Sequence, residues 1–291
     1  MGFKSLEEIV KKSNIEEKLF WEIVLEEDIK ERQVKREDSF GKMKAMYQAM
    51  KEADKSYNAK LHSSSNLVGG DGAKVYQAVR QEKLICGDFI GTVMARAISM
   101  SESNACMRRI VAAPTAGSCG VMPAVFLTYE ERRKISEDKM IEAMYIAAGI
   151  GEVIASRAFI SGAEGGCQAE IGSASAMAAA GIAYLNGGGN EEICHASALA
   201  LKNLLGLACD PVAGLVEVPC VKRNVLGAVN ALTSADLATI GVKSAIPPDE
   251  VIDAMREIGI SMPKAIRETG EGGLAATKTG KKIAEALNII Q

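Results

Sequence analysis

Aromatic residues and histidine are scarce in this chain of 291 residues: Phe, Trp and Tyr together make up 4% of it, and only two residues are His. The two histidines, His62 and His195, are far apart in sequence, which excludes a His-rich metal site or a paired-His zinc motif. Runs of alternating β-branched residues, which are typical of strands, are also few. The low aromatic content and the few alternating β-branched runs favour a mostly helical protein.

Nucleotide-binding motifs are missing as well. No GxGxxG segment follows a strand-like run, so a dinucleotide-binding fold is not supported. Gly280 and Lys281 resemble the end of a phosphate-binding loop, but Ala275 stands where that loop needs its earlier glycine, and Lys282 follows in place of Ser or Thr. We also find no lysine in a motif typical of pyridoxal-phosphate enzymes.

The charge pattern offers little to nucleic acid or membranes. The net charge is −3, with no basic patch of the kind that binds nucleic acid or an anionic surface. The N-terminus, MGFKSLEEIV, has no apolar core like that of a signal peptide, so we expect a cytoplasmic protein. The longest uncharged stretch, residues 171–190, is mostly Ala, Gly and Ser and is too weakly apolar to partition well into lipid. We interpret it as a core helix.

Seven cysteines are present, an odd number with no CxxC pair, so neither a disulfide framework nor a zinc ribbon is indicated. Four of them lie in loops close to Gly or Pro: Cys119, Cys167, Cys209 and Cys220. The other three lie in helical or mixed runs, and we interpret them as small core residues: Cys86, Cys106 and Cys194. Any cysteine cluster must therefore be assembled from distant segments.

We divide the chain into an N-terminal helical segment, residues 1–60, and a larger domain, residues 61–291, unless both form one continuous domain. The first segment is charged and carries apolar residues at spacings of three and four, as in surface helices that could contact another chain. In the second, helical runs cover residues 140–160 and a segment that must stop near Cys209, because Pro211 follows. The predicted fold class is all-α, with an Ala- and Gly-rich helical domain and binding loops.

Two loops of small residues carry groups suited to binding a carboxylate. In LHSSSNLVGGDGAK, hydroxyl and amide side chains precede glycines and a helix start, and APTAGSCG has a similar arrangement. Backbone N–H groups at such positions bind anions. The residues concerned are Ser63, Ser64, Ser65, Asn66, Gly69, Gly70, Thr115, Gly117 and Ser118. Both loops can equally be turns that only begin helices.

A third glycine-rich segment, SGAEGGCQAEIGSASAMAAAGI, places Cys167 between Glu164 and Glu170, ahead of a helix expected from about Ile171. The glycines let the backbone wrap a bound group at close range, which Cβ atoms would obstruct. Backbone amides and a helix N-terminus favour a thiolate at Cys167. Each glutamate is either a polar group of the site or an exposed carboxylate at a helix start.

Together these segments resemble the α subunit of iron–sulfur-dependent L-serine dehydratase, and the likeness runs from about Ser63 to the final helix. The resemblance implies a [4Fe-4S] cluster held by Cys167, Cys209 and Cys220. Cys220 follows a proline, a common neighbour of cluster cysteines. Lys222 and Arg223 offer compensating positive charge nearby, unless they are a solvated pair.

The resemblance further implies deamination of L-serine to pyruvate and ammonia without pyridoxal phosphate, as in amino-acid degradation and gluconeogenesis. Three cysteines on four irons leave one iron open, which can act as a Lewis acid for the leaving hydroxyl. As the base we name His62, whose ordinary pKa suits proton transfer although a lone His is more often structural, and its rival Lys74. Cys119 lies in a loop assigned to the substrate, so we expect it to affect catalysis and not the cluster.

Single-chain members of the family carry an additional domain with an SSSHTxGP-like motif, and we find no such motif here. The chain is therefore expected to be the α half of a hetero-oligomer, with L-serine as substrate and a β subunit as partner. Two other functions stay open. One is a related cluster-dependent lyase such as L-cysteine desulfidase, and the other is a non-catalytic helical metal-binding protein.

Overall fold

The computed structural model describes residues 2–288, and in this part of the chain helices dominate. The structure is 67% helical and contains no strand within the described residues, where one isolated parallel bridge joins Cys209 and Arg267. The predicted all-α class is confirmed.

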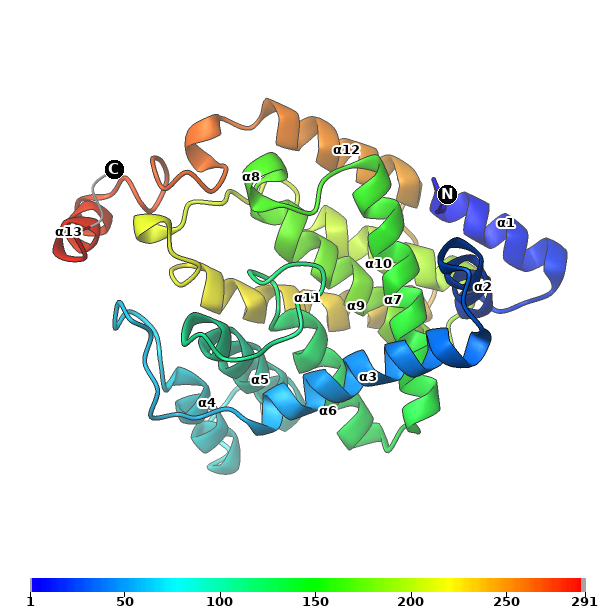
Figure 1. Ribbon diagram of the computed structural model, residues 1–291, viewed down its shortest axis with the longest axis horizontal. Coiled ribbons are helices and arrows are strands. Elements are labelled where there is room, and N and C mark those ends of the chain that lie inside the picture. The colour runs from blue at the N-terminus through cyan, green and yellow to red at the C-terminus, as the bar shows by residue number, and fades with distance from the viewer. Residues whose placement is uncertain (1, 289–291) are drawn as a thin grey trace.

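Residues 2–288 form thirteen α-helices, with a π-helical turn and two 3₁₀ turns between some of them (Figure 1). The α-helices are α1 (Leu6–Glu16), α2 (Phe20–Arg32), α3 (Arg36–Lys55), α4 (Asp71–Arg80), α5 (Gly87–Ala105), α6 (Val121–Arg133), α7 (Glu137–Arg157), α8 (Gly162–Gly165), α9 (Ser173–Leu185), α10 (Asn190–Lys202), α11 (Cys220–Thr239), α12 (Pro248–Ser261) and α13 (Lys278–Ala286). The π-helical turn is η1 (Gln168–Gly172), and the 3₁₀ turns are η2 (Val212–Gly214) and η3 (Lys264–Ile266).

Helix α9 lies at the centre of the fold and packs against α6, α7, α10 and α11. Every residue from Ser173 to Ala183 is buried. Most of these residues are Ala, Ser or Gly, whose short side chains let neighbouring helices approach closely. At Gly181, for example, an added Cβ would collide with the ring of Phe126. No helix in residues 2–288 is both long and apolar enough to cross a membrane.

Two helix boundaries differ from the sequence prediction. The helix expected from about Ile171 is preceded by η1, and single π-helical turns are frequent at functional sites. The helix expected to stop near Cys209 already ends at Lys202, because turns follow it and Gly206 adopts a φ of 81°. The run predicted at residues 140–160 is observed as α7.

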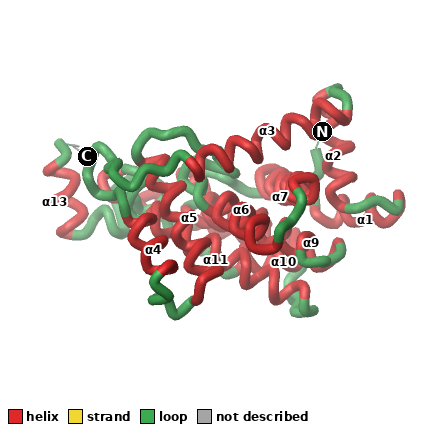
Figure 2. The backbone as a smooth tube through the Cα atoms, turned by 90° about the horizontal axis from the view of Figure 1, so that it is seen from below, coloured by secondary structure: helices red, strands yellow, loops and turns green. Residues whose placement is uncertain are grey.

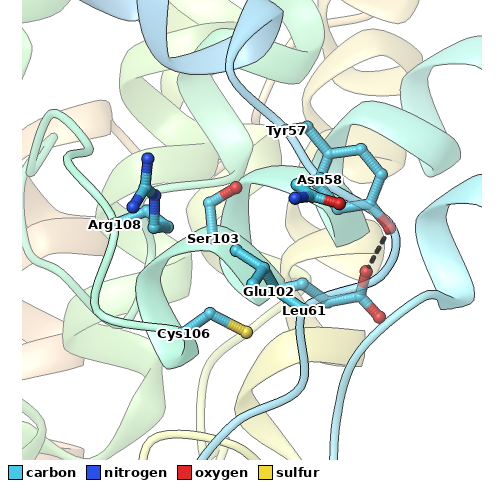
Figure 3. A pocket seen from close by; sticks show the side chains of 7 residues that line it. All are labelled: Tyr57, Asn58, Leu61, Glu102, Ser103, Cys106 and Arg108. Carbon is cyan, nitrogen blue, oxygen red and sulfur yellow. Dashed lines mark hydrogen bonds between the residues drawn. The ribbon is translucent and has the colours of Figure 1, made fainter.

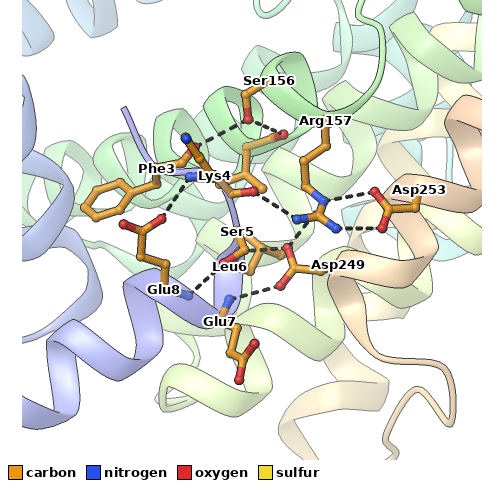
Figure 4. A network of polar contacts seen from close by, with 11 residues as sticks. Phe3, Lys4, Ser5, Leu6, Glu7, Glu8, Ser156, Arg157, Asp249 and Asp253 are labelled. Atoms are coloured by element: carbon orange, nitrogen blue, oxygen red, sulfur yellow. Dashed lines mark hydrogen bonds and ion pairs between the residues drawn. The ribbon is translucent and has the colours of Figure 1, made fainter. Parts of the chain in front are cut away.

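Helices α1 to α3 share the main hydrophobic core. Their buried members of that core include Leu6, Ile9, Phe20, Ile23 and Met50. Figure 4 shows how the start of α1 is fastened: the carboxylate of Asp249 accepts the N–H groups of Leu6 at 2.8 Å and Glu7 at 3.1 Å. An acid at this position satisfies N–H groups that the helix leaves unpaired. Arg157 of α7 also pairs with Asp253 of α12 at 2.6 Å.

Long loops gather at the end of the molecule near α4, α5 and α13, away from α1 and α2 (Figure 2). They include the segments before α4, before α6, between α10 and α11, and after α12. The loops that the sequence singles out therefore lie at one end of the helical core.

Candidate active site

The three cysteines that the resemblance assigns to a cluster come together in the structure. Cys167 precedes η1, Cys209 lies in the loop after α10, and Cys220 is the first residue of α11. Their exposed fractions are 2%, 2% and 7%. The side chains of Cys167 and Cys209 are hydrogen-bonded, and charge on Cys167 acts on Cys220. Three segments distant in sequence thus share one buried group of thiols.

The glycine before Cys167 lets another part of the chain pack closely against this turn. Gly166 has a φ of 76°, and an added Cβ there would lie 2.6 Å from the sulfur of Met262. The next side chain, Gln168, donates to the carbonyl oxygen of Met255 at 3.0 Å and accepts the N–H of Gly206 at 2.9 Å. The turn that carries Cys167 is therefore held to α12 and to the loop that leads to Cys209.

Cys209 is placed by main-chain bonds to the segment after α12. Its N–H donates to the carbonyl oxygen of Ile266 at 2.8 Å, and its own carbonyl accepts the N–H of Glu268 at 2.7 Å. The next residue, Asp210, accepts the N–H of Leu274 at 2.8 Å. Hydrogen bonds thus hold the segment after α12 against Cys209 and Asp210.

Arg223 supplies positive charge to the thiols. Its guanidinium donates to Asp210 at 2.8 Å and also hydrogen-bonds Cys167. The hydrogen bond from Cys209, helped by the charge of Arg223, lowers the pKa of Cys167 against the effect of burial. The same hydrogen bond, together with burial, raises the pKa of Cys209, and burial raises the pKa of Cys220 to about 12. Of the three thiols, Cys167 is therefore the one whose thiolate is favoured.

A buried carboxyl group, Glu170, lies next to the thiols. It accepts a hydrogen bond from the hydroxyl of Thr115 at 2.8 Å. Burial raises the pKa of Glu170, and Glu268 raises it further, although the Thr115 hydrogen bond opposes both. A Cβ added at Gly162 would lie 2.9 Å from both Cys209 Sγ and Glu170 Oε2, and 3.1 Å from Glu268 Oε2. A thiol and two carboxyl groups therefore converge on a glycine that has no side chain to separate them.

The serine-rich loop before α4 lies against the start of α11. Ser63 is buried and donates to Glu217 Oε2 at 2.9 Å, and Ser65 donates to the same oxygen. By contrast, Ser64 and Asn66 are exposed. Gly69 and Gly70 both have positive φ, at 145° and 79°, and a Cβ at Gly69 would lie 2.5 Å from the carbonyl oxygen of Leu61.

The second loop meets α11 through Asn224, which is fully buried. The Asn224 amide donates to the carbonyl oxygens of Gly117 at 2.8 Å and Cys220 at 3.0 Å, and it accepts the N–H of Gly120 at 2.9 Å. In the same loop the hydroxyl of the buried Ser118 lies 3.1 Å from that of Thr115. Both loops that the sequence suggests for substrate are thus attached to the segment that carries Cys220.

The three residues predicted to be catalytic have different environments. His62 is exposed on the serine-rich loop. Lys74 is exposed and pairs with Asp71 at 2.8 Å, which raises the pKa of Lys74 and opposes a role as a base at neutral pH. Cys119 is fully buried, with its sulfur 3.8 Å from the carbonyl oxygen of Met100, and burial raises its pKa to about 12.

The interpretation of the remaining cysteines is partly wrong. Cys194 is buried, as expected, and Cys106 is half-buried, but Cys86 is exposed in the turn before α5. The frequent burial of free cysteines suggested a core position, whereas the turn directs Cys86 to solvent.

A small pocket beside the serine-rich loop contains a buried acid, Glu102 (Figure 3). Its carboxylate accepts the hydroxyl of Tyr57 at 2.7 Å and the N–H groups of Asp71 at 2.8 Å and Gly72 at 3.3 Å. Glu102 therefore caps α4 from α5 and supports the far end of the serine-rich loop.

Sequence reasoning missed three polar residues of the site: Gln168, Glu217 and Asn224. One signal was present for Glu217, since it is an acid inside the apolar run LVEVPCV, where an unpaired charge would be costly. Gln168 and Asn224 gave no such signal, because an amide in a helix is ordinarily solvated.

The helical scaffold thus joins buried thiols to polar loops at one end of the core. The chain belongs to the serine dehydratase alpha chain family, whose model matches residues 16–275. It is 43% identical over 285 residues to the probable L-serine dehydratase, alpha chain, of Bacillus subtilis (strain 168), which covers 98% of this chain and 95% of that protein. It is 46% identical over 264 residues to the L-serine dehydratase, alpha chain, of Peptoniphilus asaccharolyticus, with 90% of each chain covered.

A longer relative matches over a smaller share of its length. The L-serine dehydratase TdcG of Escherichia coli (strain K12) is 45% identical over 181 residues, which is 62% of this chain and 40% of that protein.

Proposed function

We propose that this chain is the α subunit of an L-serine dehydratase, which converts L-serine to pyruvate and ammonia. Membership of the family and the names of its relatives support this activity. The observation that carries the proposal is the meeting of three buried thiols, Arg223 and two polar loops at one end of the helical core.

We further propose that Cys167, Cys209 and Cys220 hold a [4Fe-4S] cluster. Their burial, the adjacent guanidinium and the bare Gly162 support the fit, because a cluster needs thiolates, compensating charge and space. Within residues 2–288 no three His, Cys, Asp or Glu side chains are arranged to hold a single metal ion. Each of the three cysteines would bind the cluster through its sulfur, and each thiol would lose its proton on loading.

When bound, such a cluster supplies an open iron that acts as a Lewis acid on the substrate hydroxyl. The chain's own residues stabilise the thiolates and orient the substrate. Arg223 stabilises the thiolates, and the glycine-rich main chain of both loops orients the carboxylate of serine. The Thr115 hydroxyl holds Glu170 beside the thiols. The thiol of Cys119 is fully buried in the same loop, and its raised pKa keeps it protonated at neutral pH.

For removal of the α-proton we retain His62. An imidazole is the commonest general base in proteins, and the side chain of His62 is exposed on the serine-rich loop. Lys74 is the weaker assignment because its ion pair with Asp71 stabilises the protonated form.

A β subunit completes the proposed enzyme, and we place the hetero-oligomer in the cytoplasm. The names of the Bacillus subtilis and Peptoniphilus asaccharolyticus relatives, both alpha chains, support a multi-subunit enzyme. The match to only 40% of the longer Escherichia coli relative is consistent with a second part supplied by another chain.

The test is anaerobic purification of the chain alone and with its β subunit, followed by iron and labile-sulfide analysis. Pyruvate formed from L-serine by the iron-loaded complex supports the proposal. Release of sulfide from L-cysteine without serine turnover would instead identify a desulfidase. A protein that binds zinc or no metal, and turns over neither amino acid, would make this a non-catalytic helical protein.

A further inference from the structure

Glu217 is a buried acid whose partners come from a distant part of the chain. Its exposed fraction is 5%, and it precedes Cys220 by three residues. Within the described residues it has no lysine or arginine partner, and its side-chain hydrogen bonds come from the hydroxyls of Ser63 and Ser65, 154 and 152 residues away. A carboxylate is costly to bury without such donors, so the contact is specific.

We propose that Glu217 is a positioning residue that holds the serine-rich loop against the Cys220 segment and thereby sets where L-serine is bound relative to Cys220. This inference rests on the proposed function. It also divides the serine cluster by role: the hydroxyls of Ser63 and Ser65 are engaged by Glu217, and the exposed Ser64 and Asn66 are left to contact the substrate.

Hydrogen bonds within the serine-rich loop hold its residues together as one unit beside the contact with Glu217. The N–H of Ser63 donates to the carbonyl oxygen of Val68 at 3.0 Å, and the N–H of Asn66 donates to that of Ser63 at 2.9 Å. The N–H of Leu67 donates to Ser65 Oγ at 3.1 Å. A loop closed by its own hydrogen bonds transmits a shift at Ser63 or Ser65 to the residues between them.

Two other contacts attach the far end of the same segment to α11. Val68 packs with Val221 in a small apolar cluster, and Asp71 pairs with Lys222 at 2.7 Å. These contacts keep α4 in place when Glu217 is changed, so the expected effect is local to the serine end of the loop. Because Glu217 accepts both hydroxyls with a single oxygen, loss of its charge weakens both bonds together.

The test is Glu217→Gln in the iron-loaded complex with the β subunit. We expect KM for L-serine to rise about tenfold with less than about a threefold change in kcat, and with unchanged iron content and visible spectrum. The matched control is Glu27→Gln, which removes a carboxylate of similar burial, 7% exposed, that pairs with Lys12 and Lys30 in the N-terminal helices. This control should leave KM unchanged.

A double-mutant comparison separates the two roles of the serines. Combining Glu217→Gln with Ser65→Ala should raise KM no further than Glu217→Gln alone, because both changes remove one contact. Combining it with Ser64→Ala should raise KM further, because Ser64 itself contacts the substrate, but by less than the product of the two single effects, because Glu217 acts partly through the position of Ser64. If Glu217→Gln does not fold, Ser65→Ala alone tests the same contact.

Unchanged KM in both Glu217→Gln and Ser65→Ala would overturn the proposal, and so would loss of iron from Glu217→Gln. If the wild-type complex does not turn over L-serine, the proposed function fails instead. In that case hydrogen exchange of the peptide that spans residues 61–70 still tests the anchor. Faster exchange in Glu217→Gln than in Glu27→Gln supports it, and equal exchange refutes it.

Discussion

Replacing Gly162 with Ala tests whether the space beside Cys209 is part of the site. The added Cβ would lie 2.9 Å from Cys209 Sγ, 2.9 Å from Glu170 Oε2 and 3.1 Å from Glu268 Oε2. All three distances are well inside the separation of about 3.5–4 Å at which non-bonded atoms attract. The methyl group therefore enters the space on which a thiol and two carboxyl groups converge.

The stability effect is the difference between two opposing contributions. Crowding of a packed interior costs about 1–3 kcal/mol, and replacing a helical glycine by alanine gains about 0.5–1 kcal/mol. The net loss is about 1 kcal/mol, which lowers Tm by about 2 °C in a domain of this size. The matched control is Gly41→Ala in α3, where an added Cβ meets nothing within 4 Å. It should raise Tm slightly.

The assays are thermal unfolding of the iron-free chain by circular dichroism and iron analysis after anaerobic reconstitution. Gly162→Ala should retain the helical signal, unfold about 2 °C below wild type and bind less iron, whereas Gly41→Ala should bind as much iron as wild type. If Gly162→Ala matches Gly41→Ala in both Tm and iron content, the space at Gly162 is not part of a cluster site.

The other predictions concern the ligands, the protons and the loop support. Alanine variants of Cys167, Cys209 and Cys220 should each lose iron and activity together. Cys119→Ala should keep its iron but lose activity. Iron analysis and a pyruvate assay check both predictions. Because burial raises the pKa of Cys220 to about 12, cluster assembly must displace a bound proton. Iron uptake should therefore increase from about pH 6 to about pH 9, and uptake independent of pH would contradict protonated ligands. Glu102→Ala leaves a hydroxyl and two N–H groups without their acceptor and should cost about 1–3 kcal/mol in urea unfolding.

Local patterns in the sequence identified the segments of the site but not their contacts. Glycine and proline mark loops because they restrict or free particular backbone angles, and the thiols of Cys167, Cys209 and Cys220 stand in such loops. The bonds that join these loops are made by Gln168, Glu217 and Asn224, whose partners are 38 to 154 residues away. No local periodicity encodes pairings at such separations.

By itself the sequence determined the helical class and the Ala-rich core helix, because propensity and side-chain size belong to individual residues. The tertiary structure alone decided burial and neighbours. Packing of the helices left Cys86 exposed and Cys119 buried, although both stand near helix starts, and it brought Glu217 to Ser63 across 154 residues. These outcomes depend on which faces of distant helices meet, and that is settled only when the whole core closes.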